Sequence, residues 1–176
     1  MTDIETSPRL WTETGFRDDE WVRVEVAEAL AGQGRRIVPL GVFLSLDEAR
    51  RASLAASTGV EILPGEALDP ILPCLDDLAM VVLPFPAFND GRSFSKAELL
   101  RRRHGYRGIV RATGDVLIDL IPHMLRTGFT EMVVSNPTAL ARLGEGRLGG
   151  LPLHYQPTAR PAAPGASYSW RRQPAA

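Results

Sequence analysis

The stretch that decides the fold is Met80–Ser95, which reads MVVLPFPAFNDGRSFS. Its first six residues are a continuous apolar run, the pattern of a strand in a parallel sheet with both faces covered. Prolines and the Asn-Asp-Gly turn at residues 89–91 then lead toward a helix. Backbone amides at a helix N-terminus attract anions, and ligands of open α/β sheets lie beyond the carboxyl ends of the strands. The stretch therefore predicts an α/β fold and a candidate binding site together.

Apolar strand-like runs alternate with helical patterns on both sides of this stretch. Repeated β-then-α units of this length predict a mostly parallel sheet of about four or five strands flanked by helices. The pattern fits an open flavodoxin-like sheet and part of a barrel equally. Besides residues 80–85, the expected strands are Ile37–Leu44, Val60–Leu63, Ile109–Ala112 and Met132–Val134, and a last helix is expected to start at Ser135–Pro137.

Local signals predict where the other helices begin and end. Ser45–Glu48 and Ser95–Glu98 read as capping boxes, in which a serine and a glutamate each satisfy a backbone amide. Asp115 is expected to cap the following helix. Pro122 should kink that helix, and Gly128 should end it.

The length of 176 residues suits a single domain. Residues 1–36 contain short β-prone runs and predict a short N-terminal β arm or hairpin that packs two tryptophans on the main body. Residues 37–156 form the expected α/β domain. Residues 157–176 are rich in Pro, Ala, Ser and Arg and are expected to be a disordered tail.

Composition excludes several classes of function. The net charge of −1 gives no global attraction to nucleic acid or membrane, and no apolar run has the length of a signal peptide or membrane span. The single Cys74 allows no disulfide or redox pair, and the three histidines lack metal-ligand spacing. No nucleophile elbow, phosphate-binding loop or complete dinucleotide fingerprint is present. We therefore expect a soluble cytoplasmic protein without a metal site and without a nucleic-acid or membrane partner.

Positive charge is concentrated between residues 89 and 111, where seven cationic side chains face only Asp90 and Glu98. Arg92 and Arg111 each lie near the carboxyl end of a predicted strand, where an arginine can hold sulfate, sulfite, phosphate or a carboxylate bidentately. Arg101–Arg103 reads as a solvated helix face or as a docking site for an acidic partner. The candidate ligand- or partner-binding residues are Asn89, Asp90, Gly91, Arg92, Ser95, Arg111, Gly114 and Asp115.

Each candidate also has a structural interpretation. Turn and cap chemistry accounts for Gly91, Ser95 and Asp115. Asp90 and Arg92 can form a salt bridge with each other, and an arginine within a strand needs an acidic partner, for which Asp115 or Asp119 is near in sequence. The sequence identifies no catalytic residue.

Several of these motifs together resemble an uncharacterised bacterial family of unknown function. Its members are commonly described as probable oxidoreductases involved in sulfite reduction, because their genes neighbour an assimilatory sulfite or nitrite reductase. The resemblance implies a role in sulfur assimilation and implies sulfite reductase as a partner, but it supplies no catalytic residues. It rests on Leu83–Phe85, Phe88–Ser95, Leu99–Arg101, Tyr106–Gly108, Arg111–Asp119 and Gly128-Phe129.

Three hypotheses follow. The leading one is a non-redox accessory protein of assimilatory sulfite reduction that binds the reductase or a small oxyanion through the strand-end loops, with no cofactor. The alternative is a flavin- or nicotinamide-dependent oxidoreductase of the same pathway, although redox ligands and a complete dinucleotide motif are missing. The third is a structural protein whose basic helix forms an oligomer or partner interface.

Overall fold

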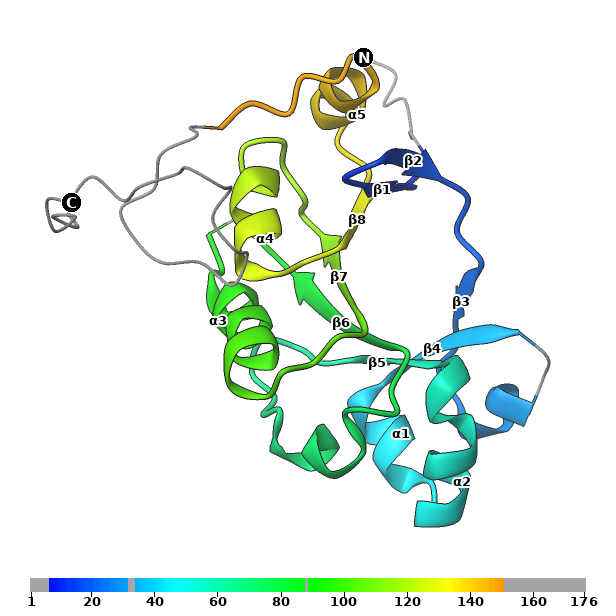
Figure 1. The fold of residues 1–176 in the computed structure, drawn as a ribbon. Coiled ribbons are helices and arrows are strands. Elements are labelled where there is room, and N and C mark those ends of the chain that lie inside the picture. The colour runs from blue at the N-terminus through cyan, green and yellow to red at the C-terminus, as the bar shows by residue number, and fades with distance from the viewer. Residues whose placement is uncertain (1–6, 32–33, 88, 151–176) are drawn as a thin grey trace, which may run out of the picture.

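The computed structural model describes residues 7–31, 34–87 and 89–150, which form one curled sheet with helices packed against it (Figure 1). The sheet has eight strands in the order β2-β1-β8-β7-β6-β5-β4-β3. Strands β3 to β8 follow chain order and pair in parallel, whereas β1 pairs antiparallel with both β8 and β2. The strands are β1 (Arg9–Thr12), β2 (Gly15–Arg17), β3 (Trp21–Arg23), β4 (Arg35–Pro39), β5 (Thr58–Glu61), β6 (Met80–Phe85), β7 (Ile109–Gly114) and β8 (Glu131–Val134).

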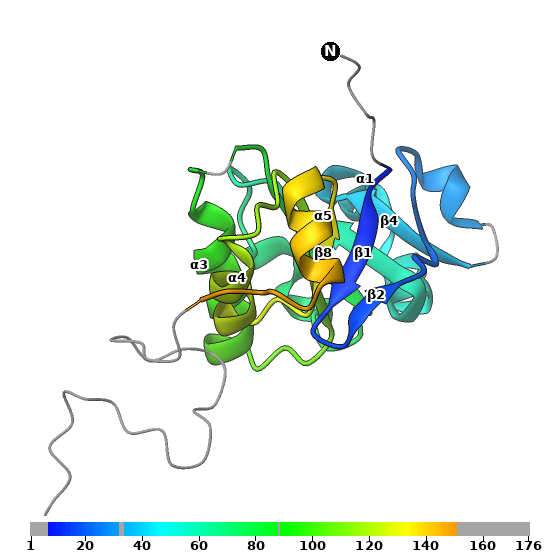
Figure 2. The ribbon, with the colours of Figure 1, turned by 90° about the horizontal axis from the view of Figure 1, so that it is seen from above.

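The helices collect on one face of the sheet, because successive parallel strands are neighbours and crossovers of one hand return to the same side. The helix α5 contacts the β1–β2 hairpin and lies beside it when the molecule is seen from above (Figure 2). The helices are α1 (Leu40–Ser45), α2 (Glu48–Leu54), α3 (Arg92–Glu98), α4 (Ile121–Thr127) and α5 (Pro137–Gly144), with 3₁₀ turns at Ala27–Ala31, Ala55–Ser57 and Asp69–Cys74 and a π turn at Leu99–Arg103.

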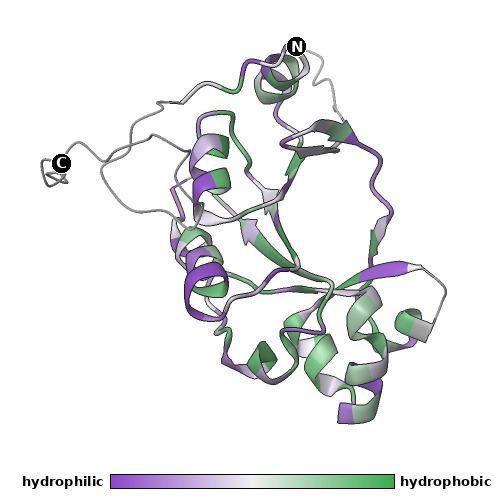
Figure 3. Ribbon diagram, in the orientation of Figure 1, coloured by the Kyte–Doolittle hydropathy of each residue, from purple (hydrophilic) through white to green (hydrophobic). Residues whose placement is uncertain are grey.

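Alternating strand residues divide the core into two parts. One set, including Val81, Leu83 and Phe85, packs against the helices in the main hydrophobic cluster. The other set points to the opposite face, which we call the inner face, where Trp21, Ile37, Met80 and Val82 form a smaller cluster. The connection from β2 to β3 is hydrophilic (Figure 3).

The single-domain α/β fold is confirmed, but the expected mostly parallel sheet of four or five strands is wrong, since the sheet is mixed and has eight strands. The additional strands come from residues 9–23, whose short runs pair at both edges of the sheet. Trp11 and Trp21 are both buried there. The β2 and β3 strands are the two edges, and residues 18–20 connect them directly. Of the domain boundaries, the predicted tail at 157–176 lies outside the described residues.

The predicted strand Ile37–Leu44 is partly wrong. The chain is extended only to Pro39, and residues 40–45 form α1. In α1, Leu40 and Phe43 are buried one helical turn apart. A short apolar run that is buried as a helix has the same composition as a buried strand, so periodicity did not separate them.

The expected helix starts are wrong at three positions. Asp47, not Ser45, caps α2, because its carboxylate accepts the amide of Arg50 at 2.8 Å. The helix α3 begins at Arg92, one turn before the expected cap Ser95. Asp115 does not cap α4, which begins only at Ile121.

Four other local predictions concern helices α4 and α5 and strand β6. Pro122 lies in the first turn of α4, where proline is tolerated, so it does not kink the helix. Gly128 ends α4 in the left-handed conformation, with φ of 104°, as expected. The helix at Pro137 and the strand at Met80–Phe85 are also confirmed, and Asn136 caps the former by accepting the amide of Ala139.

Candidate functional site

At the carboxyl ends of the strands, the predicted pair Asp90 and Arg92 interact with each other. The Arg92 guanidinium donates through Nε to Asp90 Oδ1 at 2.9 Å and through a terminal nitrogen to Oδ2 at 2.7 Å. The Arg92 side chain is 63% exposed. Its hydrogen bonds lower the pKa of the Asp90 carboxyl from 3.8 to about 2. Arg92 therefore uses its bidentate geometry on its own loop.

Arg111 lies on the other side of the sheet from Arg92. It is paired with Val82 across β6 and β7, which places it on the inner face, and its side chain is 1% exposed. It donates to both carboxylate oxygens of Asp19, at 2.9 and 3.0 Å, and to Glu131 at 2.8 Å. The expected sequence neighbours Asp115 and Asp119 are not these partners. Arg92 and Arg111 are thus not brought together.

Gly114 and Asp115 join the ends of β6 and β7. Gly114 has φ of 85°, and a Cβ atom there would lie 2.3 Å from the carbonyl oxygen of Phe85. That same oxygen accepts the amide of Asp115 at 2.7 Å. These two positions are therefore constrained by backbone packing. Of the remaining candidates, Asn89 and Ser95 are exposed, and Gly91 precedes α3 with an ordinary negative φ.

Lys96 is a buried cation at this end that the sequence did not single out. Its ammonium donates to the carbonyl oxygens of Leu63 and Pro64, the latter at 3.1 Å. Burial lowers the pKa of Lys96, and Glu66 opposes that change. The lysine ties the loop after β5 to α3. Arg92 and Lys96, the cations of α3 near the carboxyl ends of the strands, therefore hold loops in place.

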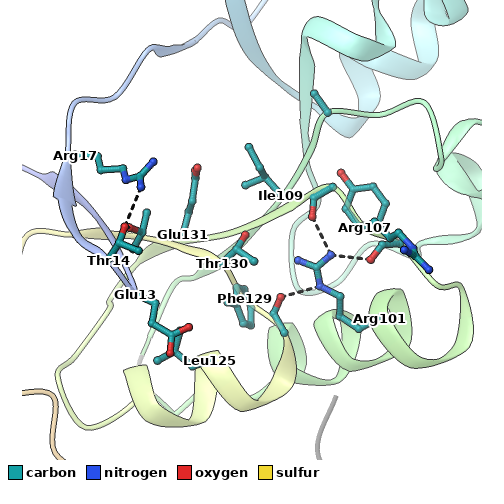
Figure 4. Close-up of a pocket in the computed structure, with 15 residues that line it drawn as sticks. Glu13, Thr14, Arg17, Arg101, Arg107, Ile109, Leu125, Phe129, Thr130 and Glu131 are labelled. Carbon is teal, nitrogen blue, oxygen red and sulfur yellow. Dashed lines mark hydrogen bonds between the residues drawn. The ribbon is translucent and has the colours of Figure 1, made fainter. Parts of the chain in front are cut away.

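A cavity of about 770 Å³ opens at the opposite end, between the β1–β2 hairpin and the amino ends of β7 and β8 (Figure 4). Arg17 and Arg101 lie on opposite sides of Thr130 and Glu131 in this view. The polar side chains of its lining are Thr12, Glu13, Thr14, Arg17, Arg101, Tyr106, Arg107, Thr130 and Glu131.

The Arg101 side chain in this cavity wall donates its hydrogen bonds to backbone oxygens. Its Nε donates to Gly128 O at 2.8 Å, and one terminal nitrogen donates to Tyr106 O at 2.7 Å and Gly108 O at 2.8 Å. Within the described residues, no carboxylate forms a salt bridge with it. Burial lowers the pKa of Arg101 from its usual value. The guanidinium is thus fixed in position, and carbonyl dipoles rather than a carboxylate of the described residues oppose its charge.

Tyr106 forms the support beneath Arg101. The guanidinium carbon lies 5.6 Å from the centroid of the tyrosine ring, and the phenol donates to Leu78 O at 2.9 Å. Burial raises the pKa of the phenol. A Cβ atom at Gly108 would lie 2.2 Å from the phenol oxygen, and one at Gly128 would lie 2.3 Å from Arg101 Cγ. Both glycines therefore make room for this pair.

The interpretation of Arg101–Arg103 as a solvated helix face is wrong for Arg101, which is half-buried in the cavity wall. Arg102 pairs with Glu98 at 2.8 Å on the surface and Arg103 is exposed, so the three arginines have different surroundings. The signal that could have found Arg101 is the run Gly105–Gly108, where glycines flank an aromatic residue just after the arginine. Such glycines often mark a close approach of backbone and side chain.

Neither a metal-binding cluster nor a membrane-spanning helix is found in the described part of the chain. Residues 7–31, 34–87 and 89–150 contain no group of three or more His, Cys, Asp or Glu side chains arranged to hold a metal ion. Over the same residues, none of the helices combines the length and the apolar character needed to cross a membrane.

The comparison with known proteins identifies a family of unknown function. None of the curated proteins matches the chain. A family model described as a bacterial protein of unknown function, DUF934, matches residues 59–165, which include β5 to β8, Arg101 and Arg111. Because this match covers more than half of the 176 residues, the chain belongs to the bacterial family of unknown function DUF934.

Proposed function

We propose that this protein binds a small oxyanion in the cavity at the amino ends of β7 and β8, and that it acts as an accessory protein of assimilatory sulfite reduction. The observation that carries the ligand class is Arg101, a guanidinium in the cavity wall that is positioned by three backbone oxygens and the Tyr106 ring and forms no salt bridge with a carboxylate of the described residues. The pathway is supported only by the resemblance of the sequence motifs described above. Sulfite and sulfate are the oxyanions that such a pathway supplies.

The charges around the cavity favour an anion. Arg17, Arg101 and Arg107 line it together with Glu13 and Glu131. The Glu131 carboxylate is already paired with Arg111 at 2.7 Å, so its negative charge is largely compensated from behind. Partial removal from water strengthens the attraction between a guanidinium and an oxyanion. Charge-assisted hydrogen bonds of this type are shorter and stronger than neutral ones.

Two hydroxyl groups in the lining donate within the chain, Thr12 to Gly15 O at 3.1 Å and Thr130 to Val110 O at 3.4 Å. Arg17 donates to the Thr14 hydroxyl at 2.9 Å. A tetrahedral or pyramidal oxyanion offers several acceptor oxygens, and the guanidinium groups of the lining supply the donors for them. The candidate loop at Asn89–Arg92 is a poorer oxyanion site, because Asp90 occupies the arginine.

Binding by isothermal titration calorimetry tests the ligand, with sodium sulfite and sodium sulfate at constant ionic strength. Arg17→Gln/Arg107→Gln removes two exposed lining charges and leaves the structural Arg101 in place. We expect it to weaken binding about tenfold or more, because each lost charged hydrogen bond is worth roughly 1.5–3 kcal/mol. Arg103→Gln is the matched control, because it removes an exposed arginine outside the lining. Equal loss in both variants, or no binding by the unaltered protein, would contradict the ligand assignment.

Growth of a gene-deletion strain tests the pathway. We expect the strain to grow on sulfide or cysteine but poorly on sulfate or sulfite, since the defect lies at the reduction step. Recovery of sulfite reductase with the affinity-purified protein from sulfate-grown cells would test the partner. The competing enzyme hypothesis predicts a yellow protein with flavin absorbance or a nicotinamide-dependent thermal shift, and the purified protein distinguishes the two.

A further inference from the structure

The inner face of the sheet carries a buried cation directly behind the cavity. Ile109 lines the cavity, and Arg111 is the next residue of β7 on the same face. Glu131 lines the cavity as well and is the register partner of Arg111 on β8. Arg111 is therefore one step along β7 from the cavity-lining Ile109, and its partner Glu131 itself lines the cavity.

The second partner of Arg111 does not come from a strand. Asp19 lies in the hydrophilic connection between the edge strands β2 and β3 (Figure 3), and its side chain is 34% exposed. It holds Arg111 with both oxygens, and its Oδ1 also accepts the amide of Trp21 at 3.1 Å. This is the same bidentate geometry that an arginine offers to a free oxyanion.

Arg111 has two carboxylate partners within the described residues. Glu131 on β8 accepts a hydrogen bond from Arg111 Nε at 2.8 Å, and a terminal nitrogen of the guanidinium lies 2.7 Å from the same carboxylate oxygen. Asp19 is the second partner, and an oxyanion in its place would keep the buried guanidinium paired. Asp19 can regain water when residues 18–20 move outward, whereas Glu131 is held within a strand.

We propose that Asp19 is a displaceable carboxylate that occupies the place of an oxyanion on Arg111, and that ligand binding moves residues 18–20 away from the inner face. This inference rests on the proposed function, since the competing ligand is the same small oxyanion entering through the cavity. Asp19 then lowers the affinity for the oxyanion, and Arg111 is the innermost cation of the site. Residues 18–20 lie between β2 and β3 and belong to neither strand.

Asp19→Asn is the variant that tests this inference, with Asp18→Asn as its matched control. Both remove one negative charge from the same segment, but Asp18 forms no salt bridge within the described residues. We expect calorimetry with sodium sulfite to show at least tenfold tighter binding for Asp19→Asn and less than a twofold change for Asp18→Asn. In Asp19→Asn/Arg111→Met, checked for folding by circular dichroism, the gain should disappear.

Hydrogen–deuterium exchange on the unaltered full chain gives a second readout that needs no variant. Saturating sulfite should increase exchange at the amides of residues 18–21, including the Trp21 amide now bonded to Asp19. Sulfite binding by the unaltered protein, with equal affinities for Asp19→Asn and Asp18→Asn and unchanged exchange, would overturn the displacement and leave the proposed function standing. No sulfite binding by the unaltered protein or either variant would overturn both.

Discussion

The two ends of the parallel strands carry similar cations in different surroundings. At the carboxyl ends, Arg92 faces solvent and is paired with Asp90 two residues away, and Lys96 holds a neighbouring loop. At the amino ends, Arg101 is clamped between a tyrosine ring and three carbonyls in the wall of a cavity. The role of a cation therefore depends less on its position in the sequence than on the partner that tertiary packing brings to it.

Separate replacement of Arg101 and Arg92 by methionine should show the largest difference between the two ends. Arg101→Met leaves three carbonyls without their donor and should lower the free energy of unfolding by about 2–4 kcal/mol, with water in the cavity offsetting part of the loss. Arg92→Met removes only an exposed pair and should leave that free energy unchanged within error. Urea unfolding followed by circular dichroism measures both. Equal losses would contradict the contrast between the two ends.

Tyr106→Phe should have an intermediate effect. It removes the hydrogen bond to Leu78 O and should cost about 1–2 kcal/mol of unfolding free energy at neutral pH. The raised pKa of the phenol adds a pH dependence. Above about pH 10, the unfolded chain releases the phenol proton while the folded chain keeps it, so stability should fall as the pH rises.

The same variant supplies the control for this alkaline prediction. In Tyr106→Phe, the part of the stability loss above pH 10 that comes from this phenol should vanish. Ultraviolet absorbance of tyrosinate follows the titration directly, and one of the three tyrosines should ionise well after an exposed phenol does. If all three tyrosines titrate together in the folded protein, the Tyr106 phenol is exposed to solvent rather than buried beneath Arg101.

Asp90 should show the smallest effect, visible in its titration more than in stability. Its pKa is lowered from 3.8 to about 2, chiefly by the hydrogen bonds from Arg92. The stabilisation from this pair should therefore be complete above pH 4 and be lost as the pH falls through about 2. Carboxyl chemical shifts in NMR measure the pKa, and Arg92→Ala should return it toward 3.8. An unchanged pKa of Asp90 in that variant would show that Arg92 does not form these hydrogen bonds with Asp90 in solution.

Elements with long or strong local sequence patterns were predicted more reliably than elements with short or weak patterns. The strand at Met80–Phe85 and the glycine that ends α4 were confirmed, because an uninterrupted apolar run and a C-terminal glycine are strong signals. The capping residues were less predictable, since Ser45, Asp47 and Ser95 all suit a cap and only packing selects among them. The eight-stranded sheet was missed because strands of three or four residues, such as β2 and β3, carry little periodicity.

For the candidate site, the sequence found Arg111 as a notable cation but not its partners. Asp115 and Asp119 were near in sequence, whereas Asp19 and Glu131 are near in space. No local pattern connects residues 19, 111 and 131, because the strands that bring them together are ordered by long-range pairing. The amino-end cavity was missed for the same reason, since its walls come from the hairpin at residues 12–17 and from the starts of β7 and β8.

By itself, the sequence determined the alternation of strands and helices, the α/β class and the concentration of cations between residues 89 and 111, because these depend on composition and short-range periodicity. Only the tertiary structure decided which cations are neutralised and which are held in a cavity wall. The physical reason is that the energy of a charge depends on its burial and on the groups within a few ångströms. For Arg92 those groups are local in sequence, and for Arg101 they include the turn after α4. For Arg111 they come from β8 and from the connection between β2 and β3.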